Sequence, residues 1–241
     1  MTTIDERFAA KKAALNELGR LSRTSYEALA AWYDVELTFT SNAIEGNTLT
    51  RSETAIVLEK GITVNGKPLR DHMEAVRHKD ALDYVRGLAR RDEPIRDIDI
   101  RHIHSLLLGR SDPENAGRYS TGQRMISGSP LVLRGPAEFS SLMADFSSWL
   151  FNTPPNAETA FTAHERLVTI HPFSDGNGRT ERLLMNLILF KAGYPPVIIG
   201  PEERADYIAS LEELQLRRSS DMYLRFMTRR LDASLITISA F

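Results

Sequence analysis

The sequence contains no cysteine among its 241 residues. This absence excludes disulfide bonds and zinc sites with thiolate ligands. The sequence also lacks an apolar run of the roughly 18 to 20 residues that a membrane-spanning helix needs. Residues 1–12 mix charged side chains with short ones and contain no apolar signal segment. We therefore expect a cytoplasmic protein.

An excess of either charge is also missing, because 30 Lys and Arg residues stand against 32 Asp and Glu residues. Such a balance supplies no overall field for nucleic acid or for an anionic membrane, so any anion site must be local. A hydrophobic content of 42% is sufficient for a core. Neither a repeat nor a linker is visible, and we expect one domain over residues 1–241.

Helical periodicity dominates the chain. Apolar spacing predicts helices over about 4–43 (with a break at Gly19), 70–88, 97–108, 137–151, 157–170, 183–190, 201–217 and 220–235. Thr50 and Glu53 have the spacing of a capping box, opening a helix that Gly61 ends, and Asn156 is an expected N-cap. Glycines and a proline between 118 and 135 predict one β-hairpin. The predicted fold class is all-α with a short hairpin.

The segment 171–182, HPFSDGNGRTER, combines the groups needed to handle a nucleoside triphosphate. Gly176 and Gly178 let backbone N–H groups face an anion, and a helix starting near Asn177 adds its positive dipole end. Arg179 and Arg182 are three residues apart, so they share one helix face and can both bind phosphate oxygens.

Three other residues of this segment carry chemistry. Asp175 offers the hard oxygen ligand that Mg²⁺ needs. His171 can take a proton from a hydroxyl near neutral pH, and Asn177 can donate its amide to the α-phosphate. Each residue alone has an ordinary explanation, as a helix cap, a turn residue or a solvent-exposed arginine. Their coincidence favours a nucleotide site.

The pattern HPFxDGNGRxxR resembles the signature of the Fic family, whose members mostly transfer AMP from ATP to protein hydroxyls. The resemblance implies a Fic-type helical bundle, with His171 as the general base and Asp175 as the Mg²⁺ ligand. It implies that Asn177 contacts the α-phosphate, Arg179 the phosphates and Arg182 the γ-phosphate. The products would be AMP-modified protein and pyrophosphate.

An upstream segment, 41–47, resembles the Fic inhibitory motif: Ser41 is followed by three residues, Glu45 and Gly46. Its N-terminal position implies intramolecular inhibition, carried by N-terminal helices over 1–49 that precede a Fic core over 50–241. Glu45 would meet Arg182 in place of the γ-phosphate. The ordinary alternative is a glutamate and a glycine that simply end a surface helix.

Two further regions are family-like. Residues 118–135 are similar to the hairpin flap that aligns the target as an added strand, and within it we assign target docking to Gln123, Arg124, Met125 and Ile126. The alternative is an ordinary surface hairpin. Residues 204–208 resemble a region near the adenine, so Tyr207 would flank the base, unless it is a core residue. His102, His104 and His164 are assigned to packing or surface, and we infer no protein-held zinc site.

The leading hypothesis is an autoinhibited protein adenylyltransferase that uses Mg²⁺ and ATP and modifies Ser, Thr or Tyr of a target protein, which can be the protein itself. One alternative is removal of AMP from a target, with Glu45 positioning water. Another is a nucleotide-binding regulator or scaffold with little turnover that works through self-association, for example as a homodimer. The intact set from His171 to Arg182 argues against a mere binding protein. Relatives that transfer UMP or phosphocholine, or that phosphorylate, keep the transferred group open.

Overall fold

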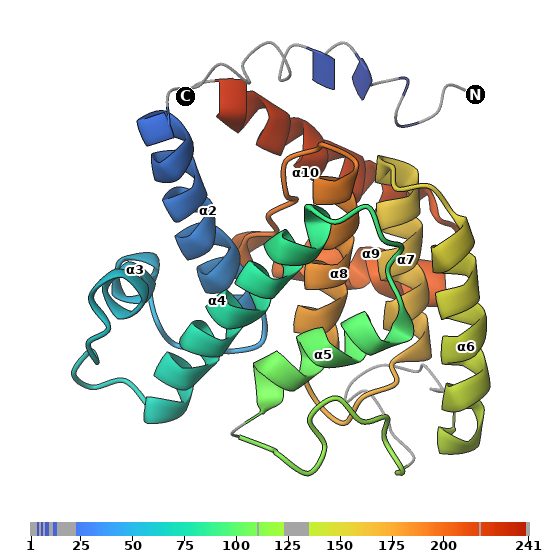
Figure 1. Cartoon of the computed structure of the whole chain (residues 1–241), viewed down its shortest axis with the longest axis horizontal. Coiled ribbons are helices and arrows are strands. Elements are labelled where there is room, and N and C mark those ends of the chain that lie inside the picture. The colour runs from blue at the N-terminus through green and yellow to red at the C-terminus, as the bar shows by residue number, and fades with distance from the viewer. Residues whose placement is uncertain are drawn as a thin grey trace.

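The computed structural model describes residues 4, 6, 8–9, 12–13, 23–109, 111–122, 135–216 and 218–239. Helices joined by loops make up this part of the chain (Figure 1). Their bounds are α2 Arg23–Ile44, α3 Arg51–Lys60, α4 Leu69–Ala89, α5 Asp97–Leu108, α6 Pro136–Asn152, α7 Ala157–Ile170, α8 Asn177–Lys191, the 3-10 turn η1 Pro201–Glu203, α9 Arg204–Gln215 and α10 Asp221–Ser239. The expected all-α class is confirmed for these residues.

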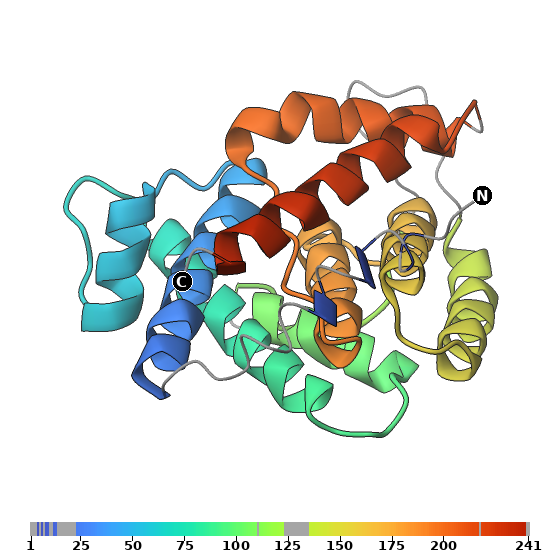
Figure 2. The same cartoon turned by 90° about the horizontal axis from the view of Figure 1, so that it is seen from above.

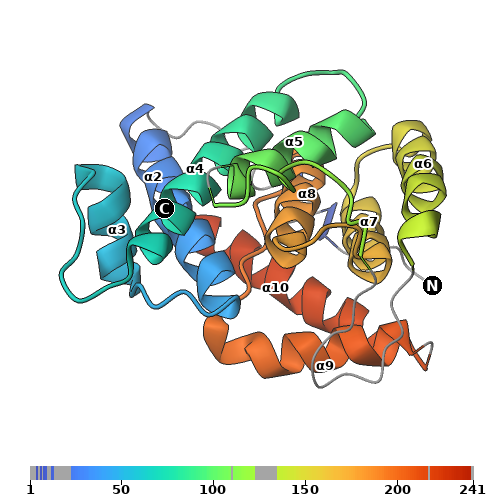
Figure 3. The same ribbon diagram turned by 90° about the horizontal axis from the view of Figure 1, so that it is seen from below.

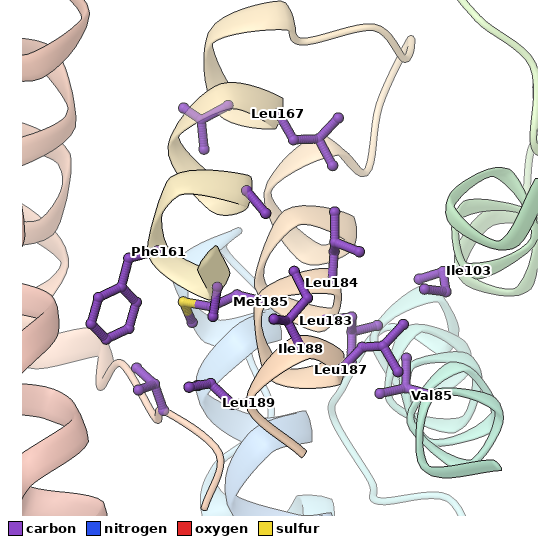
Figure 4. Packing of buried hydrophobic residues seen from close by; sticks show 14 of the residues in the cluster. Val85, Ile103, Phe161, Leu167, Leu183, Leu184, Met185, Leu187, Ile188 and Leu189 are labelled. Carbon is purple, nitrogen blue, oxygen red and sulfur yellow. The ribbon is translucent and has the colours of Figure 1, made fainter. Parts of the chain in front are cut away.

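Helix α8 lies at the centre of the molecule, between α7 on one side and α4 and α5 on the other (Figure 1, Figure 3). Its apolar residues from Leu183 to Leu189 are buried and Phe190 is partly buried, as expected for a helix that is apolar on nearly every face. Figure 4 shows Leu184, Leu187 and Ile188 of α8 within the core to which Phe161 of α7 and Val85 of α4 also belong. The residues that follow the signature therefore anchor it in the core.

The remaining helices surround this centre. Helices α2 and α3 lie beside α4, and α6 lies beside α7 (Figure 1). Helices α9 and α10 form an antiparallel pair across one face of the molecule (Figure 2, Figure 3). Helix α2 buries Leu29, Tyr33, Leu37 and Ile44 in the main core, so it is an integral part of the fold. In the part of the chain that the structure describes, no helix is both long and apolar enough to cross a bilayer.

The predicted helix ends have the expected hydrogen bonds. The Thr50 Oγ1 accepts the Glu53 N–H at 3.2 Å, and the Glu53 carboxylate accepts the Thr50 N–H at 2.7 Å. Gly61 ends α3 in the left-handed region at φ 65°. The Asn156 Oδ1 accepts the Thr159 N–H at the start of α7. The capping box, the glycine stop and the asparagine N-cap are all confirmed.

Two expectations differ from the structure or lie outside it. The helix expected over 201–217 is divided, because Pro201 opens a 3-10 turn before α9 begins at Arg204. In the region of the expected hairpin, residues 123–134 lie outside the described residues, and with them the docking residues Gln123, Arg124, Met125 and Ile126. Within the described residues, β pairing in this region is an isolated antiparallel bridge between Tyr119 and Phe173. The hairpin therefore stays a prediction.

Candidate active site

His171 ends α7 in the left-handed backbone conformation, at φ 51° and ψ 55°. Among the described residues it is the non-glycine residue with positive φ. Such a conformation costs roughly 1–2 kcal/mol for a residue with a Cβ, and strain of this kind often marks a functional position. The His171 side chain is 25% exposed, so a bound molecule can reach its ring.

The loop after His171 is held by two buried side chains. The Asn177 amide accepts the Phe173 N–H and donates to the Phe173 carbonyl, both at 2.9 Å. His104 donates from Nε2 to the Asp175 carbonyl and accepts the Gly117 N–H at Nδ1, each at 2.9 Å. Burial lowers the pKa of His104 to about 4, so it stays neutral and keeps these two roles. His104 thus packs as expected, and it also fixes the loop.

The start of the expected flap is attached to the same loop. The Ser120 N–H donates to the Pro172 carbonyl at 2.8 Å, next to the bridge between Tyr119 and Phe173. The His104 ring stacks on Phe173, with centroids 3.8 Å apart. A target segment bound at residues 118–122 would therefore lie beside the signature.

Arg182 is enclosed by the inhibitory segment, as the sequence predicts. Its Nη2 lies 2.8 Å from the Glu45 carboxylate and 2.9 Å from the Ser41 carbonyl, and its Nε donates to the Ser41 hydroxyl at 3.0 Å. Gly46 follows Glu45 at φ 94° and allows the chain to turn away from α2. The motif residues Ser41, Glu45 and Gly46 and the signature residue Arg182, far apart in sequence, form one cluster.

The charges of this cluster stabilise one another. Burial alone would raise the pKa of Glu45, but attraction to Arg182 and their hydrogen bond outweigh it, so the pKa lies below its usual value. Burial alone would lower the pKa of Arg182, whereas Glu45 raises it. Glu45 is therefore a carboxylate at neutral pH.

The Glu45 carboxylate lies over the first turn of α8. A Cβ added to Gly178 would stand 2.4 Å from the Glu45 Oε1 and 2.9 Å from the Arg182 Nη1. The glycine therefore leaves room for both side chains to approach the helix, and a larger residue would displace them. The first turn of a helix presents unpaired N–H groups and a positive dipole end to an anion. Glu45 occupies the place that the sequence assigns to a phosphate.

Arg179 and Asp175 lie at the rim of the same site. The Arg179 Nη2 is 3.7 Å from the Asp175 Oδ2, and its Nη1 is 3.8 Å from the Glu74 Oε1. The Asp175 side chain is 71% exposed, and its Oδ1 accepts the Gly176 N–H. Both side chains are close enough to the α8 N-terminus to meet a bound phosphate chain.

The residues present suit Mg²⁺ brought in by a nucleotide. Within the described part of the chain, no group of three or more His, Asp or Glu side chains could hold a metal ion alone. Mg²⁺ bound to a triphosphate usually takes one or two carboxylates, with phosphate oxygens and waters as the other ligands. The exposed carboxylate of Asp175 provides such a donor.

Tyr207 lies behind Arg182 and not at an open surface. It is 2% exposed, and its hydroxyl lies 2.8 Å from the His164 Nε2. The His164 Nδ1 lies 2.9 Å from the Tyr223 hydroxyl, which donates to the Phe161 carbonyl. Since that hydroxyl proton is engaged, His164 donates to Tyr223 and accepts from Tyr207. The contact of Tyr207 with adenine stays a prediction. In this structure the Tyr207 side chain is hydrogen-bonded to Arg182 and supports it.

Sequence reasoning missed three residues of the site. Glu74 faces Arg179, and His78 accepts or donates at the Thr38 hydroxyl while lying close to Arg179 and Arg182. Glu181 is buried in α8 near His171. None of them belongs to a recognisable spacing, because each meets its partner only when helices pack. Glu74 and His78 of α4 approach the arginines of α8, and Glu181 of α8 approaches His171 at the end of α7.

Fold and site together define a helical protein in which a glycine loop leads into the N-terminus of α8, and the carboxylate of Glu45, just beyond the end of α2, lies over that N-terminus. A model of the Fic/DOC family matches residues 94–189, which include the signature. Among solved structures, a Fic-1 fragment from Caenorhabditis elegans superposes with a TM-score of 0.83 at 32% identity, over 98% of this chain and 71% of that chain. This chain belongs to the Fic family.

Two other relatives extend the comparison. The protein adenylyltransferase Fic of Nematostella vectensis is 42% identical over 196 residues, which are 78% of this chain and 45% of that protein. A Fic domain containing signaling protein from Bacteroides thetaiotaomicron has a TM-score of 0.85 at 25% identity, covering 98% of this chain and 96% of that one. The chain spans less than half the length of the curated relatives named as adenylyltransferases.

Proposed function

We propose that this chain is an autoinhibited protein adenylyltransferase, which transfers AMP from ATP to a hydroxyl group of a protein. The observation that carries the proposal is the ion pair between Glu45 and Arg182, 2.8 Å long and lying over Gly178. A carboxylate at a helix N-terminus of the Fic signature marks the position of an anionic substrate. The names of the relatives supply the transferred group.

In the proposed reaction, the triphosphate replaces the Glu45 carboxylate at the α8 N-terminus. Arg182 then pairs with the γ-phosphate and Arg179 with the neighbouring oxygens, as forked donors do. Asp175 would hold the Mg²⁺ that accompanies ATP and neutralises part of the phosphate charge. The Asn177 amide has a second hydrogen, besides the one given to Phe173, with which it can reach the α-phosphate.

His171 supplies the base. It takes the proton of the target hydroxyl as that oxygen attacks the α-phosphorus. The bond from the α-phosphorus to the bridging oxygen breaks, and pyrophosphate leaves with the electron pair. The exposed edge of the imidazole and the adjacent flap residues 118–122 are consistent with a target strand on this side. The acceptor would be Ser, Thr or Tyr.

Inhibition requires little free energy. An occupancy of about 99% for the inhibited arrangement needs about 2.7 kcal/mol. Two unit charges 4 Å apart attract by about 4 kcal/mol at an effective dielectric near 20, before desolvation and solvent screening are subtracted. The Glu45 side chain is 40% exposed, so screening is substantial. The two contacts from Ser41 to Arg182 hold the guanidinium in place for this pairing.

The test compares AMP incorporation from labelled ATP and Mg²⁺ by native protein, Glu45→Gly and Glu45→Gln, with self-modification or a lysate as the acceptor. Both variants should increase transfer about 10- to 100-fold, and Glu45→Gly with His171→Ala should lose it. Glu27→Gln, on the exposed part of α2, is the matched control and should leave transfer unchanged. Equal rates for native protein and both Glu45 variants would refute autoinhibition.

Removal of AMP is a second candidate activity, favoured by the partial exposure of Glu45, whose carboxylate can position water beside the site. It predicts that native protein releases AMP from an isolated modified target and that Glu45→Gln does not.

A nucleotide-binding scaffold that acts as a homodimer is the third candidate. The scaffold hypothesis predicts nucleotide binding without transfer in every Glu45 variant. If transfer does occur, mass spectrometry of the modified target identifies the transferred group.

A further inference from the structure

Glu181 is a buried carboxyl directly behind the proposed base. It occupies one of the three variable positions of the signature and is 3% exposed. Its Oε1 lies 4.0 Å from the Nδ1 of His171, the ring nitrogen opposite the one that would face a substrate. A hydrogen bond between these two atoms would require them to lie about 1 Å closer.

The position of Glu181 is costly for a carboxyl that only fills space. Its Oε1 receives no hydrogen bond from any residue that the structure describes. Leaving a buried polar atom without a partner typically costs 1–3 kcal/mol, and more when the group is charged. A leucine or methionine would fill the volume without that cost. A role of the carboxyl in positioning His171 would explain why this buried group is present.

The groups around Glu181 determine its charge. Burial raises the pKa of Glu181 to about 8, Arg182 opposes the shift, and the charge of Glu45 adds to it. The hydroxyl groups of Tyr207 from α9 and Tyr223 from α10 are the other titratable neighbours, and burial keeps both neutral by raising their pKa values. Glu181 is thus protonated for most of the time while Glu45 is in place.

We propose that Glu181 is the positioning residue for His171, an inference that rests on the proposed function. Its carboxyl accepts a hydrogen bond from the Nδ1–H of His171, so that Nε2 faces the target hydroxyl. The same hydrogen bond stabilises the imidazolium as it forms. The proton removed from the target moves to Nε2, and the proton already on Nδ1 stays there, shared with Glu181. Glu181 itself touches neither ATP nor the target. The arrangement follows the general rule that a base is oriented by a third group.

Removal of Glu45 would strengthen the stabilisation of the His171 imidazolium by Glu181. Without the Glu45 charge the pKa of Glu181 lies below its present value of about 8, so more of it is ionised at neutral pH. An ionised carboxylate stabilises an imidazolium better than the neutral acid does. Displacement of Glu45 would therefore free the phosphate site and improve the base at once.

The experiment measures kcat against pH for Glu45→Gly with and without Glu181→Gln. Glutamine imitates the neutral acid, so the two proteins should differ little at pH 6 and by about 10- to 100-fold at pH 8.5, the size of one lost charge-assisted hydrogen bond. Glu165→Gln on α7 is the matched control, because Glu165 is a partly buried carboxyl whose pKa burial raises and the charge of Arg166 lowers. It should leave the pH profile unchanged.

A second measurement needs no transfer. Nitrogen-15 spectra of the His171 imidazole at pH 8.5, above the pKa of Glu181 of about 8, should show the proton on Nδ1 in the native protein and a mixture of tautomers in Glu181→Gln. Thermal unfolding is recorded to confirm that both proteins are folded. A pH-independent ratio of kcat values together with an unchanged tautomer would overturn the role of Glu181. A changed tautomer without any transfer in the Glu45→Gly protein would support Glu181 and refute the proposed function instead.

Discussion

At the residue scale, Gly176 is the most constrained glycine of the signature. It opens α8 at φ 71°, and an added Cβ would lie 2.5 Å from the Leu108 Cδ1 and 3.5 Å from the His104 ring. A left-handed conformation costs a residue with a Cβ about 1–2 kcal/mol, and overpacking adds about 1–3 kcal/mol. Gly176→Ala should therefore lower the free energy of unfolding by about 2–5 kcal/mol, measured by urea titration.

The control for this prediction is Gly61→Ala. Gly61 also has a positive φ, 65°, but a Cβ added there would meet no atom within 4 Å. Gly61→Ala should lower the free energy of unfolding by only about 1–2 kcal/mol, the cost of the left-handed backbone conformation for a residue with a Cβ. Equal losses at the two glycines would show that Leu108 moves aside and that the loop is not fixed by α5.

The residues that could be foreseen are those whose partners are encoded nearby or in a second motif. Gly176 and Arg182 belong to one contiguous segment, and Glu45 stands in its own motif, which the family resemblance connected to Arg182. His104 and Glu181 were not foreseen in their roles. Each meets the signature only after α5, α7 and α8 have packed, and a lone histidine or glutamate carries no pattern.

At the scale of elements, the end of α2 is held by α9. The Arg204 Nε donates to the Ile44 carbonyl at 2.8 Å, one residue before Glu45, and the Arg204 charge also helps to lower the pKa of Glu45. One hydrogen bond is worth about 1 kcal/mol, or roughly fivefold in an equilibrium. Arg204→Ala in the otherwise native chain should increase AMP transfer by about two- to tenfold, measured with labelled ATP.

A matched control exists in Arg230, whose Nε donates to the Ile198 carbonyl at 2.7 Å in the loop after α8. Arg230→Ala removes a similar contact away from the inhibitory segment, and it should leave transfer at the native level. The same increase of AMP transfer in Arg204→Ala and Arg230→Ala would mean that a general loss of stability, and not the release of the end of α2, raises transfer.

The elements themselves were largely predictable, because capping signals and apolar periodicity act locally. Thr50, Gly61 and Asn156 mark helix ends that the structure confirms. The 3-10 turn before Arg204 was missed, since a proline at a helix start also fits a continuous helix. How the helices cross was not accessible, because crossing depends on which side chains interdigitate over long sequence distances.

For the whole molecule, buried titratable groups set the pH of maximum stability. Burial lowers the pKa values of His78 and His164 to about 3 and of His104 to about 4, from 6.5. Below pH 6.5 the unfolded chain binds these protons and the folded chain does not, so stability falls as the pH falls. Each histidine contributes about 1.4 kcal/mol per pH unit.

Glu181 acts in the opposite direction, because its folded pKa of about 8 lies above the ordinary 4.5. Between these values the folded chain keeps a proton that the unfolded chain loses, so stability falls as the pH rises. The free energy of unfolding should therefore peak near pH 6.5, falling by about 2–3 kcal/mol per unit on the acid side and about 1.4 on the alkaline side. Urea titrations from pH 5 to 8 test this, and Glu181→Gln should flatten the alkaline side and steepen the acid side.

The anchoring of α2 would limit the motion that relieves the proposed inhibition. Swinging the whole helix outward would expose core side chains such as Leu37 and Ile44, each costing about 1.5–3 kcal/mol. Glu45 lies just beyond the end of α2, and Gly46 follows it as a flexible hinge. The less costly motion is a rotation about a few backbone bonds. Amide hydrogens of α2 should then exchange slowly in native protein and in Glu45→Gly alike. The proposed inhibition would in that case depend on a small movement of Glu45, while α2 stays in place.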